Sequence, residues 1–324
     1  MSQPAHTSTP NPQSFYTWVN QTWQPVLFTQ RSHSHLQTLR LTTWNIDFQA
    51  PCKTERMNAA LSYLSKLHGD TTTNTTNTPS MIFLQEMVSS DLVLIQEKQW
   101  IRDRFFITDL SDVNWGARYG TTTLIDKRLD VQRVFRVLYS PSRMQRDALF
   151  VDINIDIQPT ESTSSNENRI IRLGNTHLES LVSRPPLRPM QLRRASEFMH
   201  GHDHGQVAQS QDSLPTPYAA VLAGDMNAFA SEDLTAPEEC GLSDAFLLSD
   251  RMKEKFGCSR MDKVLFCGGL EVKSLERIGA EQKIWIDYPQ ESDSESSSET
   301  GEEMWVTDHL GLQVEFRILP SVET

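Results

Sequence analysis

Ala220-Val221-Leu222-Ala223-Gly224-Asp225-Met226-Asn227-Ala228 is an apolar stretch that ends in two polar side chains. The apolar run has the length of a buried strand, and a glycine closes it. Asp225 and Asn227 are two residues apart, so on an extended backbone both side chains lie on one face. Polar groups at the end of a buried strand need partners, or they face a site. A simple Asx turn explains one such end equally well.

The same pattern recurs at four other predicted strand ends, which weakens the explanation by a turn alone. The polar pairs at these ends are Asn45 and Asp47, Gln85 and Glu86, Asn175 and His177, and Asp308 and His309. Five such ends, spread from residue 45 to residue 309, predict an active site assembled at one rim of a sheet.

Strands and helices are predicted to alternate along the chain. Period-two patterns and β-branched residues predict strands over 39–47, 81–84, 121–125, 131–139, 148–157, 170–175, 220–225, 259–266, 269–278 and 311–319. Apolar residues at helical spacing predict helices over 53–68, 91–105, 187–199 and 241–250. This interleaving in 324 residues predicts an α/β protein with a sizeable core.

Two segments are expected to lie outside the folded domain of residues 36–320. Residues 1–35 are rich in Ser, Thr, Gln and Pro and predict a polar, largely disordered tail, although its aromatic residues could dock as a short helix or strand. An insertion at 287–303 is expected to be disordered, because Glu291 to Glu303 carries six acids and no base.

Charge, cysteine spacing and hydropathy argue against several classes of protein. The net charge of −12 argues against generic nucleic-acid binding, but arginine clusters at 184–194 and at Arg143 and Arg146 leave a basic groove open. The four cysteines lack zinc-site spacing, and no apolar run is long enough to span a bilayer. The polar first twelve residues lack the apolar stretch of a secretory signal. We therefore expect a protein of the nucleus and/or cytoplasm, not secreted and without a membrane partner.

The carboxylates at the strand ends suit a hard divalent cation. Asp47, Glu86 and Asp308 offer oxygen ligands of the kind that Mg²⁺ or Mn²⁺ takes while keeping several waters. The sequence has no GxSxG motif, no P-loop and no GxGxxG motif, which argues against a serine nucleophile and against nucleotide-binding folds.

The remaining polar residues suit hydrolysis at phosphorus. Asp225, helped by Asn227, can orient or deprotonate a water molecule. His177 and His309 can hold a phosphate or stabilise the charge that develops on it. Together with the carboxylates, this set predicts metal-assisted attack of water on a phosphoester.

The motifs resemble a known superfamily. TWNID at 43–47, FLQE at 83–86, NTHLES at 175–180, GDMN at 224–227 and TDHLG at 307–311 follow the order of the endonuclease/exonuclease/phosphatase superfamily. The resemblance covers residues 40 to 318, and TWNID, NTHLES and RMDKVLF at 260–266 are most similar to the branch that releases tyrosine from a DNA 5′-phosphate.

The resemblance implies a fold, a metal and two phosphate contacts. The fold would be α/β, a four-layer α/β sandwich of two mixed β-sheets flanked by helices. Glu86 would ligate a single Mg²⁺ (or Mn²⁺), with Asp47 holding the metal or its shell. Asn45 and His177 would contact the phosphate.

The resemblance also implies how the reaction is catalysed. Asp225 with Asn227 would position the attacking water, and Asp308 would orient His309, which would stabilise the transition state. The expected reaction is metal-dependent hydrolysis of a 5′-phosphotyrosyl DNA bond, as in the repair of trapped topoisomerase ends.

Four residues are expected to bind the substrate. Tyr119 stands where the relatives place a DNA-contacting tyrosine, and Thr121 and Arg146 are expected beside it. Trp115 and Tyr119 flank Gly116 in a loop pattern suited to stacking single-stranded bases. The expected partners are DNA 5′ ends, single-stranded or partly unpaired, and the expected state is a monomer.

Departures from the family pattern keep the substrate open. Ala228 and Phe229 stand where the relatives carry a DNA-contacting arginine, and RMKEKFGCS at 251–259 replaces a threonine-tryptophan segment. The acidic insertion is extra. The alternatives are an abasic-site endonuclease, an RNA deadenylase, another phosphodiesterase of the superfamily, or a catalytically weak relative that binds nucleic acid.

Overall fold

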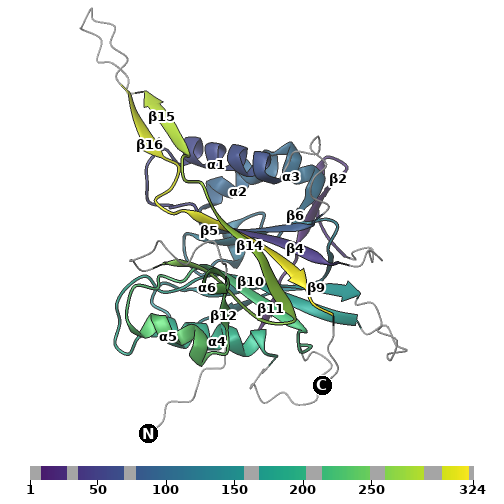
Figure 1. Cartoon of the computed structure of the whole chain (residues 1–324). Coiled ribbons are helices and arrows are strands. Elements are labelled where there is room, and N and C mark those ends of the chain that lie inside the picture. The colour runs from purple at the N-terminus through teal and green to yellow at the C-terminus, as the bar shows by residue number, and fades with distance from the viewer. Residues whose placement is uncertain are drawn as a thin grey trace, which may run out of the picture.

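Two mixed β-sheets pack face to face, and helices cover their outer faces (Figure 1). This computed structural model describes residues 9–27, 36–68, 78–156, 168–201, 214–248, 260–287 and 301–320. Helices α1 (Lys53–His68), α2 (Ser89–Glu97) and α3 (Gln99–Arg104) pack on one sheet, and α4 (Leu187–Met199) and α5 (Glu232–Glu239) pack on the other. The four-layer α/β sandwich is thus confirmed.

The first sheet has seven strands in the order β1-β8-β9-β10-β11-β13-β12. They are β1 (Asn11–Pro12), β8 (Asp130–Leu138), β9 (Asp147–Asp156), β10 (Asn168–His177), β11 (Ala219–Asp225), β12 (Ser243–Asp244) and β13 (Asp262–Gly268). Of their pairings, only that of β10 with β11 is parallel among the described strands.

The second sheet has eight strands in the order β14-β17-β4-β5-β7-β6-β2-β3. They are β2 (Tyr16–Val19), β3 (Thr22–Pro25), β4 (Thr38–Asn45), β5 (Ser80–Met87), β6 (Phe105–Ile107), β7 (Gly120–Asp126), β14 (Leu270–Ile278) and β17 (Gly311–Ile318). Strands β4 and β5 are parallel. The short elements are α6 (Ala245–Leu248), a 3₁₀ turn at Asp112–Asn114, and a hairpin of β15 (Lys283–Asp287) and β16 (Gly301–Trp305).

Strand alternation decides which polar side chains meet between the sheets. Leu173 of β10 and Val221 of β11 belong to the core between the two sheets, whereas Leu222 packs beneath α4. The same period of two carries His177 and Asp225, at the ends of these strands, to the rim of the space between the sheets.

The parallel pair in the other sheet ends at the same rim. Phe83 of β5 lies in the core between the sheets, and Gln85 follows it at the same parity. Gln85 donates to Asn175 Oδ1 at 2.8 Å, and Asn45 at the end of β4 donates to Asp225 Oδ2 at 3.1 Å. The carboxyl ends of two parallel strand pairs therefore form one polar rim.

Gly224 allows β10 and β11 to approach closely just before Asp225. Its φ of 145° lies outside the range that residues with a side chain favour. A Cβ atom at this position would lie 1.8 Å from the carbonyl oxygen of Thr176. Only glycine fits this backbone, so the residue preceding the aspartate is fixed by packing.

The N-terminal segment differs from the expected disordered tail. Over 9–27 the chain adds β1 to one sheet and β2 and β3 to the other, and Phe15 packs into the core between them. Burial of the aromatic residues outweighs the polar composition around them. Residues 1–8 and 28–35 lie outside the described residues, as do 288–300 of the expected acidic insertion, whose flanks form the β15–β16 hairpin.

Two helix predictions are also corrected. The expected helix over 91–105 is two helices, because Lys98 is extended with φ −74° and ψ 120°. Helix α5 was not expected, since Pro237 lies inside it, and the expected helix over 241–250 is reduced to α6 within the described residues. None of the helices in the described part of the chain is both long and apolar enough to cross a bilayer.

Candidate active site

Two carboxylates and a histidine meet at the rim. His177 Nε2 lies 3.3 Å from Asp225 Oδ2 and 3.8 Å from Glu86 Oε1, and the three atoms lie within 4.8 Å of one another. Burial raises the pKa of Glu86, and burial followed by repulsion from Asp262 raises the pKa of Asp225 to about 6. A site that crowds carboxylates in a poorly solvated place favours a divalent cation.

Asp225 is held by its neighbours on both oxygens. Oδ2 accepts from Asn45, and Oδ1 accepts from the backbone N–H of Asn227 at 2.8 Å. The Asn227 amide nitrogen donates to the Leu178 carbonyl at 3.1 Å, so this side chain ties the loop after β11 to the end of β10. The carboxylate is therefore fixed in orientation before any substrate arrives.

Glu86 leaves the regular alternation of β5. Its backbone has φ 58°, and the pairing of β5 with β7 shifts register between Leu84 and Met87. Such a bulge re-aims a side chain and is common next to active sites. Glu86 Oε2 accepts from the backbone N–H of Phe48 at 3.1 Å, and Oε1 faces His177.

The hydrogen bonds of His177 fix its tautomer. Nδ1 lies 2.8 Å from Arg146 Nη1, and a guanidinium can only donate, so Nδ1 accepts. The proton of the neutral ring therefore lies on Nε2, and burial followed by the charge of Arg146 lowers the pKa of His177 well below its ordinary value. Nε2 is buried and makes no hydrogen bond within the described residues. It is available as a donor toward an anionic oxygen.

Asp262, rather than Asp308, holds His309. His309 Nδ1 lies 2.8 Å from Asp262 Oδ2, whereas the Asp308 side chain is 71% exposed and its carboxylate lies 3.8 Å from Nε2. Burial opposes the charge on His309, but the bond to Asp262 and the charges of Asp225 and Asp308 raise its pKa to about 9. His309 is therefore cationic at neutral pH, 3.8 Å from Asp225.

Asp262 was missed because only its strand was noticed in the sequence. It begins an apolar strand in the RMDKVLF stretch and pairs directly with Asp225 in the β11–β13 ladder. The clue in the sequence is an acid at the start of an apolar strand. The structure adds the register, and two acids directly opposite each other repel unless a cationic group lies between them.

Asp47 is engaged elsewhere and does not join the carboxylate cluster. Its Oδ1 accepts from the backbone N–H groups of Gln49 and Ala50, and its Oδ2 lies 3.4 Å from Arg56 Nη2. Within the described ranges, the groups of atoms close enough to share a cation do not include Asp47. The prediction that Asp47 holds the metal or its shell has no support in this geometry.

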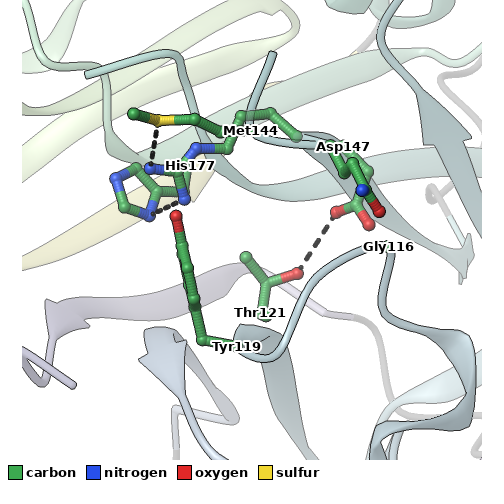
Figure 2. A pocket seen from close by; sticks show the side chains of 9 residues that line it. Gly116, Tyr119, Thr121, Met144, Asp147 and His177 are labelled. Atoms are coloured by element: carbon green, nitrogen blue, oxygen red, sulfur yellow. Dashed lines mark hydrogen bonds between the residues drawn. The ribbon is translucent and has the colours of Figure 1, made fainter. Parts of the chain in front are cut away.

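A partly open pocket lies beside His177. Figure 2 shows Tyr119 extending across it toward the His177 ring. The Arg146 guanidinium carbon lies 5.0 Å from the Tyr119 ring centre, and Phe48 stacks on the same ring at 4.1 Å. The expected substrate-binding residues Tyr119 and Arg146 therefore line one pocket next to the carboxylate cluster.

Trp115 is packed inside the protein and does not line this pocket, contrary to the expectation that it binds the substrate. It is 8% exposed, and its indole N–H donates to the Thr121 carbonyl at 3.2 Å. Thr121 lines the pocket, but its hydroxyl accepts from Arg136 at 3.0 Å. Trp115 fills the space above Gly120, where a Cβ atom would lie 2.3 Å from the indole, so its role is packing.

The sequence over residues 42–309 matches the model of the endonuclease/exonuclease/phosphatase family. The chain belongs to this family. Enzymes of the family are hydrolytic nucleases and phosphatases that depend on divalent metal. No curated protein gives a match to the sequence.

Solved structures share the fold of this family member. Humanized D. rerio TDP2 with 14 mutations superposes with a TM-score of 0.57 over 86% of this chain and 99% of that chain, at 16% identity. TDP2 from Caenorhabditis elegans superposes with a TM-score of 0.57 over 87% of this chain and 75% of that chain, at 21% identity. D. rerio TDP2 complexed with single strand DNA product superposes with a TM-score of 0.56 over 86% of this chain and 99% of that chain, at 15% identity.

Proposed function

We propose that this family member is a Mg²⁺- or Mn²⁺-dependent phosphodiesterase that hydrolyses the bond between a tyrosine and a DNA 5′-phosphate. The observation that carries the proposal is the position of His177 between the carboxylate cluster and the pocket of Tyr119 and Arg146. The motifs resemble tyrosyl-DNA phosphodiesterase 2, and the single-stranded DNA bound in one TDP2 structure supports unpaired DNA 5′ ends as the partner.

The residues present fit a divalent cation. Glu86 would hold the metal through Oε1, with Asp225 facing it, and both carboxylates are destabilised as anions by burial. His177 fits a phosphate better than a metal, because the donation from Arg146 keeps the ring proton on Nε2. When bound, Mg²⁺ supplies Lewis-acid polarisation of the phosphate and neutralises part of its charge.

The remaining residues act on water and on the phosphate. Asp225, with a pKa of about 6, is a base suited to take a proton from a water molecule near neutral pH. His177 donates from Nε2 to a phosphate oxygen, and the cationic His309 stabilises the negative charge that builds up as water attacks phosphorus. Asn45 and Asn227 hold the base in place.

The pocket suits an aromatic leaving group. Its walls include the Tyr119 side chain and the Arg146 guanidinium, and a guanidinium favours both an aromatic ring and a developing phenolate. This arrangement supports tyrosine as the group released.

A single reaction tests the proposal. A 5′-phosphotyrosyl single-stranded oligonucleotide is incubated with Mg²⁺, with EDTA, and with Asp225→Asn, using Asp112→Asn on the exposed 3₁₀ turn as the matched control. We expect metal-dependent release of tyrosine, lost by roughly 10²-fold or more in Asp225→Asn and unchanged in the control. Cleavage of an abasic duplex or poly(A) instead would reject the substrate but keep the chemistry. Failure to cleave any phosphodiester would reject both.

A further inference from the structure

The β15–β16 hairpin projects from the body of the molecule beyond α1 (Figure 1). Its base is anchored: Ile284 packs against the core beneath α1, and the Val306 N–H donates to the Gln282 carbonyl at 3.0 Å. His309 follows the hairpin after three residues. An anchored extension of this kind presents a defined surface.

One face of this hairpin carries two exposed tryptophans. Lys283 pairs with Trp305, and Trp285 pairs with Glu303, so all four side chains lie on the same face. Trp285 is 54% exposed and Trp305 is 52% exposed. Large aromatic side chains exposed on one face are typical of an interaction surface.

The face already holds a cation. Lys283 Nζ lies 4.6 Å from the centre of the Trp305 ring and 2.7 Å from Glu303 Oε2. The Trp285 indole N–H donates to Asp287 Oδ1 at 2.7 Å, which fixes that ring beside a carboxylate. Indole faces flanked by carboxylates are suited to bind an ammonium or a guanidinium.

The charge of the hairpin selects among partners. Its ten residues hold one base, Lys283, and three acids, Asp287, Glu302 and Glu303. The sequence of the connecting residues 288–300 adds four acids and no base. This charge repels the phosphates of a nucleic acid and attracts a basic chain.

We propose that the Trp285–Trp305 face binds a basic segment of a partner protein, with arginine or lysine side chains packed on the indoles and paired with the carboxylates. Arginine suits the face better than lysine, because its planar guanidinium stacks on an aromatic ring while donating to carboxylates. The surface is separate from the residues that would carry out hydrolysis, so it does not depend on the proposed function.

Binding of a labelled twelve-residue peptide of alternating arginine and glycine, followed by fluorescence anisotropy on the full chain, tests the proposal. Changing Trp285→Ala and Trp305→Ala together is expected to weaken binding at least roughly fivefold, from two exposed cation–π contacts. Lys283→Gln is expected to tighten peptide binding, because it removes the resident cation. Val113→Ala, at an exposed apolar residue of the 3₁₀ turn, should change nothing.

Whether Lys283→Gln tightens or weakens binding distinguishes a basic protein partner from a nucleic-acid partner. A labelled dT₁₂ oligonucleotide serves as the competing probe, and its binding would weaken when a base is removed. The proposal is overturned if the double tryptophan variant binds the peptide as the wild type does, or if only dT₁₂ binds and Lys283→Gln weakens it. Circular dichroism of each variant confirms that the fold is kept.

Discussion

Asp262→Asn is expected to lower the upper pH limit of activity, because His309 loses the carboxylate that keeps it cationic. Asp262 Oδ2 lies 2.8 Å from His309 Nδ1, and it is the strongest of the contacts that keep His309 cationic. Asparagine retains an oxygen acceptor at that place but not the charge. Because burial works against the cation, the pKa of His309 in this variant should fall to its ordinary value of 6.5 or lower.

The size of the effect follows from the two pKa values. With a pKa of about 9, His309 is about 90% cationic at pH 8. With a pKa of 6.5, about 3% remains cationic at pH 8 and about 75% at pH 6. Asp262→Asn should therefore lose about thirtyfold in kcat/KM at pH 8 and less than about twofold at pH 6 through this effect.

The assay is the pH profile of kcat/KM for the 5′-p-nitrophenyl ester of thymidine monophosphate at saturating Mg²⁺. The wild type should lose activity as the pH rises through about 9. The variant should lose activity already as the pH rises through about 6.5, or at a lower pH. Asp308→Asn is the matched control, since that exposed carboxylate should shift the limit by less than about half a pH unit. An equal loss at every pH in Asp262→Asn would refute the reasoning.

The remaining predictions concern the metal, stability and the strand junction. Glu86→Gln should weaken Mg²⁺ binding at least roughly tenfold by titration calorimetry, and Asp47→Asn less than about threefold, so equal losses would restore Asp47 as a ligand. Burial, then nearby arginines, lowers the pKa of His68 to about 3, so protonation below pH 6.5 favours the unfolded chain. Between pH 7 and pH 5 the wild type should lose about 2 kcal/mol more unfolding free energy in urea than His68→Gln, and parallel curves would contradict this. Gly224→Ala places a Cβ atom against the Thr176 carbonyl and should lower the unfolding free energy by about 3 kcal/mol, so an unchanged Tm would be contradictory.

Polar residues at strand ends were a sound guide to the site because strand alternation is rigid. Once the apolar residues of β10 and β11 are assigned to the core between the sheets, His177 and Asp225 must follow them to the same side. The two parallel strand pairs then bring their carboxyl ends to one rim, where Glu86 joins them. Local periodicity was enough to place His177 and Asp225, whereas Glu86 reaches the rim through the bulge in β5.

Which partners these side chains meet could not be derived from periodicity. Asp308 is next to His309 in sequence, yet Asp262, 47 residues away, makes the 2.8 Å contact. Asp47 lies at a left-handed backbone position with φ 57°, and its carboxylate caps the following loop instead of joining Glu86. Trp115 is buried because a loop folds back on β7, and such a contact depends on tertiary packing.

Tracing oxygen from water tests the central claim most directly, namely that this site delivers water to phosphorus. The wild type hydrolyses a 5′-phosphotyrosyl oligonucleotide with Mg²⁺ in ¹⁸O-labelled water, and both products are analysed by mass spectrometry. We predict one ¹⁸O atom in the DNA 5′-phosphate, none in the released tyrosine, and roughly 10²-fold less labelled product with Asp225→Asn. Label in the tyrosine, or release by Asp225→Asn at the wild-type rate, would contradict the account.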